Sequence, residues 1–308
     1  MEAITNLASI LRLANLIPAS AIVIIASSLV IYILAHNLRS AVARAFCALI
    51  AFVTLVYMGD VALYEMDSLE RAIPWLKFQW VGIAFVPVAY LHFSDTLLRT
   101  TNSTSRLRRT AVLIGYAVSA VFLLMVIFTD LVVRDGVCSP LAIQFSPGPL
   151  FRAFALYFLA AVIWGAANIS RARQRCLTST SRRRMTYLAI SFLAPALGVF
   201  PYLLAIGMRH YFFPYALQLI TLAGNTGVAL MIVVMGYSVA YFGVLTPDRV
   251  VKHNLIHYLL RGPFVAICVV ALILAIPERD LILGLPRNMA LIFAVVSLIV
   301  ILQILINL

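Results

Sequence analysis

The sequence predicts an all-α, polytopic membrane helix bundle, and three observations support this fold class. Hydrophobic residues make up 64% of the 308 positions and charged residues only 11%. Soluble domains carry about 25% charged residues, so this composition cannot cover a water-exposed surface. Long apolar runs follow one another along the chain, and basic residues gather in the connectors between them. The net charge of +12 is therefore interpreted as a feature of membrane topology, and nucleic acid is not expected as a partner.

About nine segments are apolar enough to be predicted as transmembrane helices, because a helix needs roughly 20 apolar residues to cross the hydrocarbon. The eighth segment is the shortest, since its fifteen residues would cover only about 22 Å. An earlier start near Leu255 would lengthen it. The predicted spans are 16–36, 46–66, 74–98, 111–133, 150–170, 186–207, 215–245, 263–277 and 288–308.

The connectors alternate between basic and acid-containing sequences. The connector after the fifth span is the most basic, with six arginines and no acid in residues 171–184. The connectors after the first, third and seventh spans are also rich in Arg or Lys. By the positive-inside rule the N-terminus is predicted to lie outside and the C-terminus in the cytoplasm, as in a multi-pass protein of the cell inner membrane. The arginines would hold their loops against anionic lipid on the cytoplasmic side.

Three charged residues lie within or beside the second and third predicted spans. Asp60 is the deepest acid, Glu65 lies at the outer boundary, and Lys77 enters from the outer end of the next span. A structural ion pair between Lys77 and Asp60 or Glu65 is one interpretation, because consecutive helices are usually neighbours. Contact with a ligand or ion on the outer side is a second, and solvation at the interface is a third.

Asn225 is a polar residue placed mid-membrane, between Gly224 and Gly227. Small residues let helices approach closely, so an interhelical hydrogen bond from the amide is one interpretation. A hinge or binding role is the alternative. The candidate ligand-binding or intramembrane polar residues are Asp60, Glu65, Lys77 and Asn225.

Two other acids have an arginine four residues later, which predicts ion pairs on a helix surface. These are Asp95 with Arg99 and Asp130 with Arg134.

Motifs for catalysis and for metal binding are missing from the sequence. It contains no GxSxG, HExxH, P-loop or dinucleotide-binding fingerprint. His253 and His257 share one face of a predicted amphipathic helix in residues 248–262, but no third ligand lies near them. No enzymatic activity, cofactor or metal site is therefore expected in this chain.

The stretch "WLKFQWVGIAFVPVAYLHFSDTLL", residues 75–98, resembles the third helix of the seven-transmembrane sensor region found at the N-terminus of some bacterial histidine kinases and GAF-type signalling proteins. The shared features are an early aromatic residue, Gly82, and Pro87 followed by an aromatic-rich end. The segment "YFGVLTPDRVVKHNLIHYLLRGP" is also similar to members of that group. The resemblance extends over most of residues 16–247.

This resemblance implies a membrane sensory input module for signal transduction in a two-component system. The partners it implies are the lipid bilayer, an unknown small ligand on the outer side or within the membrane, a second copy of the chain, and cytoplasmic signalling domains. We expect two parts: a sensor-like region in residues 1–247, and a region in residues 248–308 with the amphipathic helix and two additional spans.

The last predicted span ends without a basic cluster, so the helix is expected to continue after residue 308 into an effector domain. The alternative function is a small transporter or channel that acts without an effector domain. Pro87, Pro195 and Pro201 lie within predicted spans, as in transporters with broken helices, but no repeat relates the two halves of the sequence.

Overall fold

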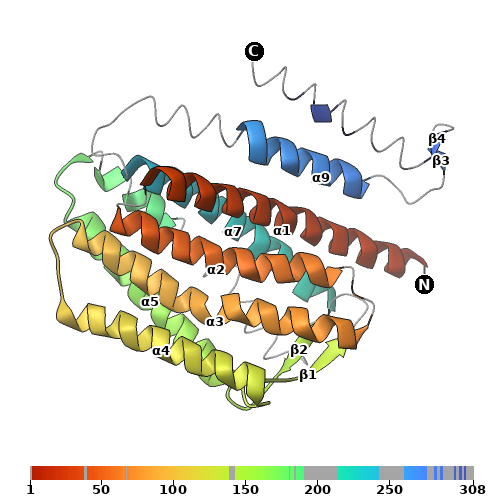
Figure 1. Ribbon diagram of the computed structural model, residues 1–308, viewed down its shortest axis with the longest axis horizontal. Coiled ribbons are helices and arrows are strands. Elements are labelled where there is room, and N and C mark those ends of the chain that lie inside the picture. Colours follow the sequence, from red (N-terminus) through yellow and green to blue (C-terminus); the bar gives the residue numbers. More distant parts are fainter. Residues whose placement is uncertain are drawn as a thin grey trace.

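Long helices that run alternately in opposite directions form the described part of the chain (Figure 1). The computed structural model describes residues 2–37, 40–64, 66, 68–138, 143–179, 181–183, 185–190, 214–242, 260–275, 281–282 and 285–286, and the single positions 295, 298, 299 and 302. The helices are α1 (Glu2–Asn37), α2 (Ala41–Tyr64), α3 (Leu69–Arg99), α4 (Arg106–Phe128), α5 (Phe151–Gln174), α7 (Pro214–Phe242) and α9 (Val265–Ala275). The strands are β1 (Val133–Cys138), β2 (Ile143–Pro147), β3 (Leu281–Ile282) and β4 (Leu285–Pro286).

Five helices are long and apolar enough to cross a membrane, and they coincide with the first five predicted spans. The segments that meet the criterion are Ile10–Leu34, Ala41–Tyr64, Leu69–Arg99, Arg106–Phe128 and Phe151–Gln174. Helix α7 coincides with the seventh predicted span. The prediction of a polytopic helical bundle is thus confirmed, while the number nine and the direction of insertion stay predictions.

The C-terminal predictions are tested only in part. The eighth span contains α9, which follows a π-helical turn, η2 (Leu260–Phe264), with Pro263 inside it. Proline has no N–H to donate, which favours an irregular turn at this position. Most of the sixth and ninth predicted spans, the amphipathic helix up to residue 259, Glu65, His253 and His257 lie outside the described residues.

Helix α3 is the central element of the bundle. It packs against α2, α4 and α5, while α1 packs against both α2 and α7. In the apolar window of α3, 78% of the residues are buried, compared with 22% in α4. The apolar surface of α4 is therefore available to face lipid, and α3 has protein neighbours on most sides. Gly82 makes part of this packing possible, because it lies against the backbone of α2 at Phe52 and Val56.

A β-hairpin between α4 and α5 corrects the prediction for residues 129–149. The sequence suggested a fourth span up to residue 133 and then an irregular connector, but α4 ends at Phe128 and strands β1 and β2 pair antiparallel. A bulge lies between Arg134 and Gly136, where Asp135 has a φ of 27°. Apolar residues at the start of this segment misled the prediction, because a short apolar run does not distinguish a helix end from a buried strand.

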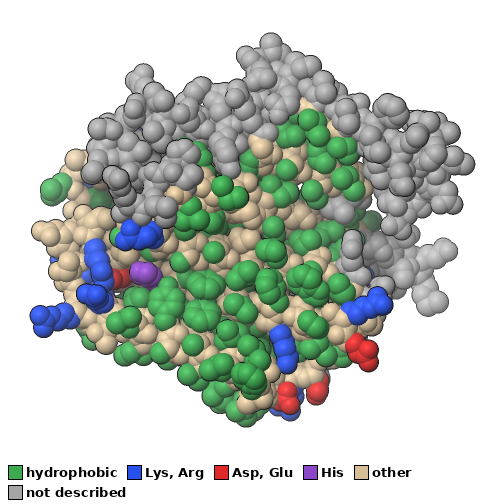
Figure 2. Space-filling view, in the orientation of Figure 1, with side chains coloured by type: hydrophobic (Ala, Val, Ile, Leu, Met, Phe, Trp, Pro, Cys, Tyr) green, Lys and Arg blue, Asp and Glu red, His purple; other side chains and the backbone are tan. Residues whose placement is uncertain are grey.

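The basic connectors lie together at one end of the bundle. The α1–α2, α3–α4 and post-α5 connectors are at the left end of Figure 1, and the α2–α3 connector and the hairpin are at the other end. Basic side chains gather at the left end in the space-filling view, with a largely hydrophobic surface beside them (Figure 2). This two-ended distribution of charge is the one that the alternating connectors predicted.

Candidate ligand-binding cavity

A cavity of about 250 Å³ lies inside the bundle, in the half nearest the hairpin. Its walls come from α1, α2, α3, α5, α7 and both strands of the hairpin. Most of the lining is apolar or aromatic, and a few polar side chains converge in it. Such a combination is typical of small-molecule sites.

Asp60, a predicted candidate, lines the cavity from the last turns of α2. The Gln79 side-chain amide of α3 donates a hydrogen bond to Asp60 Oδ1 over 2.5 Å. The same amide lies 3.4 Å from the Val56 carbonyl oxygen, one turn earlier on α2. The neighbouring helices α2 and α3 therefore hold one oxygen of this partly buried carboxylate in place.

Asn225, the second predicted candidate in the cavity, belongs to a chain of amides that joins α1 and α7. Its Nδ2 donates to Asn15 Oδ1 over 3.2 Å, and Asn15 Nδ2 donates to Gln218 Oε1 over 2.9 Å. Gln218 and Asn225 are 7% and 6% exposed, so two of the three members are buried, and Asn15 is partly buried. An interhelical hydrogen bond from Asn225 was predicted, and the structure confirms it. The partners Asn15 and Gln218 were missed, because Asn15 lies just before the first predicted span and Gln218 lies near the start of the seventh, where a polar residue is not unusual.

The predicted ion pair between Asp60 and Lys77 is wrong. Lys77 Nζ donates instead to the backbone carbonyl oxygen of Ile127 over 3.1 Å, near the C-terminal end of α4. This interaction is favourable because the last carbonyls of a helix lack partners and carry partial negative charge. Lys77 does not line the cavity, and the alternative pair with Glu65 lies outside the described residues.

Arg12 lies at the same end of the cavity and was not singled out in the sequence. Its Nη2 donates to the Tyr64 carbonyl oxygen over 3.0 Å, and its guanidinium lies 5.1 Å from the centre of the Tyr64 ring. Cation–π contact and the hydrogen bond both favour this position. The end of α2 is thereby fixed to α1.

Gln144, on strand β2, is the polar side chain that sequence reasoning had least chance of finding. It is 8% exposed, lines the cavity, and its Oε1 accepts no hydrogen bond from the described residues. The only signal was the alternation of apolar and polar residues in "IQFS", residues 143–146, which is typical of a strand. A buried acceptor without a partner is rare enough to suggest a ligand or a water.

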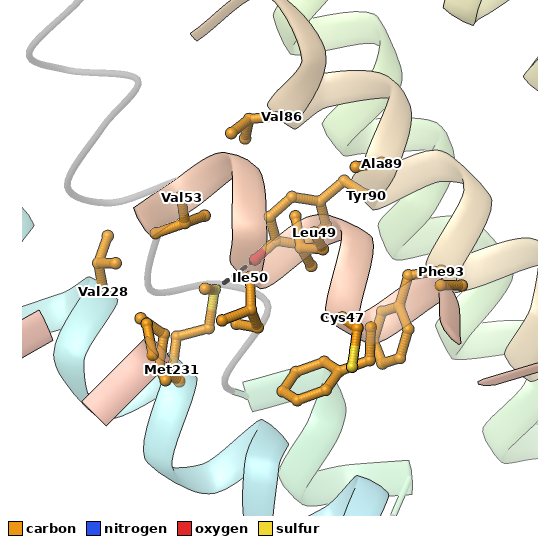
Figure 3. Packing of buried hydrophobic residues seen from close by; sticks show 14 of the residues in the cluster. Cys47, Leu49, Ile50, Val53, Val86, Ala89, Tyr90, Phe93, Val228 and Met231 are labelled. Atoms are coloured by element: carbon orange, nitrogen blue, oxygen red, sulfur yellow. Dashed lines mark hydrogen bonds between the residues drawn. The ribbon is translucent and has the colours of Figure 1, made fainter. Parts of the chain in front are cut away.

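The apolar base of the cavity is formed by α2, α3 and α7. In Figure 3, Tyr90 of α3 points across α2 towards Met231 of α7, and its hydroxyl donates to the methionine sulfur. Val53, Val86 and Val228 surround this contact and also line the cavity. Movement of α7 relative to α3 would therefore change the cavity and this contact together.

A second polar cluster lies at the basic end of the bundle and does not reach the cavity. The predicted pair of Asp95 and Arg99 is confirmed at 2.6 Å, and Arg108 of α4 adds a second ion pair at 2.9 Å. Asp95 is only 1% exposed. The predicted pair of Asp130 and Arg134 is wrong, because the helix ends before Asp130 and the two residues no longer share a helix face.

The model of a protein family, described as the N-terminal 7TM region of histidine kinase, matches residues 18–224. The chain belongs to this family. The match begins within α1, ends within α7 and includes the walls of the cavity except for its first residues on α1 and its last on α7. It confirms the resemblance seen in residues 75–98. A comparison with curated proteins gives no match.

As a 7TM region, the chain is a multi-pass membrane input module of the histidine-kinase type. The family describes a sensory region and no catalytic domain, in agreement with the expectation from sequence. Among the described residues, no group of three or more His, Cys, Asp or Glu side chains could hold a metal ion.

Proposed function

We propose that this 7TM region senses a small molecule that binds in the cavity. The observation that carries the proposal is the convergence of polar side chains from α1, α2, α3, α7 and β2 on one cavity with a mostly apolar lining. A ligand bound there would contact helices that are far apart in the sequence. It would therefore favour one arrangement of these helices over another, which is the requirement for a ligand to shift a conformational equilibrium.

The response would reach the basic end of the bundle through α3 and α7. Both helices line the cavity and continue well beyond it. In this proposal the basic end faces the cytoplasm of the cell inner membrane. Signalling domains in a larger protein, arranged as a homodimer, would receive the change there.

Native mass spectrometry of the full chain, released from lipid nanodiscs made with native membranes, tests the proposal. Wild-type protein should carry a small non-covalent adduct. Val228→Trp should lose it, because Val228 lines the cavity and is 2% exposed. Leu230→Trp is the matched control, since Leu230 lies on the same helix but is 59% exposed. Equal adducts in both variants, or none in the wild type, would contradict binding in the cavity.

A second measurement separates sensing from transport. Spin labels at Leu107→Cys and Leu177→Cys, two exposed positions at the basic end, should change their separation when the identified compound is added. If the separation stays constant and proteoliposomes accumulate the compound, the chain is a transporter and not a sensor.

A further inference from the structure

The polar groups of the cavity differ in how completely their hydrogen bonds are satisfied. The amides that join α1 and α7 largely satisfy one another: Asn15 both donates to Gln218 and accepts from Asn225. On α2 and β2 two acceptors remain. Asp60 Oδ2 has no hydrogen-bond partner among the described residues, and Gln144 Oε1 is buried without one. The unfilled capacity of Asp60 and Gln144 is therefore that of acceptors, since an ionised carboxylate can only accept. Arg12, which also lines the cavity, donates to the Tyr64 carbonyl oxygen and has further donors.

Asp60 also has no cationic partner in the described part of the chain. The ion pairs there are those of Asp95 with Arg99 and Arg108. Two basic residues of α1 and α3 are engaged elsewhere, because Arg12 donates to the Tyr64 carbonyl and Lys77 to the Ile127 carbonyl. A carboxylate in an apolar bundle without a countercharge is costly, and a cation bound beside it would offset part of that cost.

The remaining lining indicates what kind of cation fits. Aromatic side chains, among them Tyr57, Tyr64 and Trp80, line the same cavity as Asp60. Aromatic faces attract organic cations, and apolar walls favour an apolar body over a hydrated inorganic ion. The volume of about 250 Å³ is below the range of roughly 300–1,000 Å³ that is typical of drug-sized ligands. The occupant is therefore small.

From this arrangement, and resting on the proposed sensing role of the cavity, we infer that its ligand is a small organic ammonium compound with an apolar or aromatic body. The ammonium group donates to Asp60 Oδ2 and to Gln144 Oε1, and the body lies among the aromatic side chains. The ammonium could belong to a free amine or to the headgroup of an aminophospholipid, since both present the same donor.

Calorimetric titration of the full chain in phosphatidylglycerol nanodiscs tests the inference, with phenethylammonium as the probe and phenethyl alcohol and phenylacetate as matched neutral and anionic compounds. Phenethylammonium should bind the wild type best. Asp60→Asn should weaken its binding at least about tenfold, because the ion pair between ammonium and carboxylate becomes a hydrogen bond to an uncharged amide oxygen. Gln144→Leu should weaken it less. Asp130→Asn, which removes an exposed acid, should leave the affinity unchanged.

Repeating the titration with phosphatidylethanolamine in the nanodiscs distinguishes the two sources. A lower apparent affinity that Asp60→Asn abolishes identifies the lipid headgroup as a competitor, and an unchanged affinity identifies a free amine. Equal binding of the amine and the alcohol, equal binding to wild type and Asp60→Asn, or no amine binding would overturn the inference. The proposed function would survive if an adduct sensitive to Val228→Trp proved not to be an amine.

Discussion

At the residue scale, the buried Asp95 forms ion pairs with two arginines that we expect to contribute unequally to the stability of the protein. The Arg108 side chain is 11% exposed and also contacts Ser103, whereas the Arg99 side chain is 39% exposed. Removing a buried partner leaves an uncompensated charge and costs about 3–5 kcal/mol, while an exposed pair contributes about 1 kcal/mol or less.

We therefore expect Arg108→Ala to lower the free energy of unfolding by about 3 kcal/mol, near the low end of that range because Arg99 remains. Arg99→Ala, the matched control, should cost about 1 kcal/mol or less. Unfolding of the two purified variants in the same detergent measures the difference. Equal losses would show that both arginines contribute as surface charges.

Polar residues could be predicted from the sequence where they interrupt a long apolar run. The contact partner of a polar residue could not be predicted, because it depends on the direction in which the side chain points. Asp60 and Asn225 stand out because each interrupts a long apolar stretch, and both line the cavity. Lys77 was assigned the wrong partner, because the rotation of α3 about its axis decides whether a side chain reaches α2 or α4. That rotation depends on packing against several neighbours, which spacing along one helix does not reveal.

At the scale of elements, the contact between α2 and α3 depends on a glycine. A Cβ at Gly82 would lie 2.6 Å from Val56 Cγ2 and closer still to the Phe52 carbonyl oxygen. The backbone of α2 cannot turn aside as a side chain can. A Cβ at Gly115 on α4 would instead meet Val88 Cγ2 at 2.7 Å, which is a side-chain methyl group and not backbone.

Gly82→Ala should therefore destabilise the protein by about 1–3 kcal/mol, the usual cost of overpacking. Gly115→Ala should cost less than Gly82→Ala, because only a valine methyl group has to shift and the neighbouring backbone can stay in place. Thermal melting of both variants provides the comparison. A Gly115→Ala variant that melts lower than Gly82→Ala would contradict the packing seen between α2 and α3.

The hairpin is the element that hydropathy could not predict, and its absence from the prediction hid part of the cavity. Val133, Ile143, Gln144 and Phe145 all contribute to the cavity wall. Each strand is short, and the first begins at Val133, the last residue of the apolar run that was assigned to the fourth span, so the end of the helix leaves little trace in the sequence. The long helices were predictable because the thickness of a bilayer fixes their length.

At the scale of the whole molecule, the basic connectors predict that their end of the bundle faces the cytoplasm. Leu177 is fully exposed at this end, and Arg134 is exposed on the hairpin at the other. In a chain with Cys138 replaced by serine, a membrane-impermeant maleimide should label Arg134→Cys in intact cells and spare Leu177→Cys until lysis. Native Cys176 interferes little, because it is buried and burial raises the pKa of its thiol. Labelling of Leu177→Cys without lysis would reverse the orientation.

Helix α3 is one continuous helix that contributes residues both to the cavity and to the arginine cluster at the basic end of the bundle. Gln79 lies at the cavity and Asp95 in the arginine cluster, about 24 Å apart at the helical rise of 1.5 Å per residue. Pro87 lies midway between them and has no N–H to donate, so the helix is softest there. Because Val86 and Tyr90 also line the cavity, Pro87 lies within the cavity-lining part of α3, and a ligand that moves this part would bend the helix there. The arginine cluster is bound to α4 through Arg108, so this motion would shift the connector between α3 and α4.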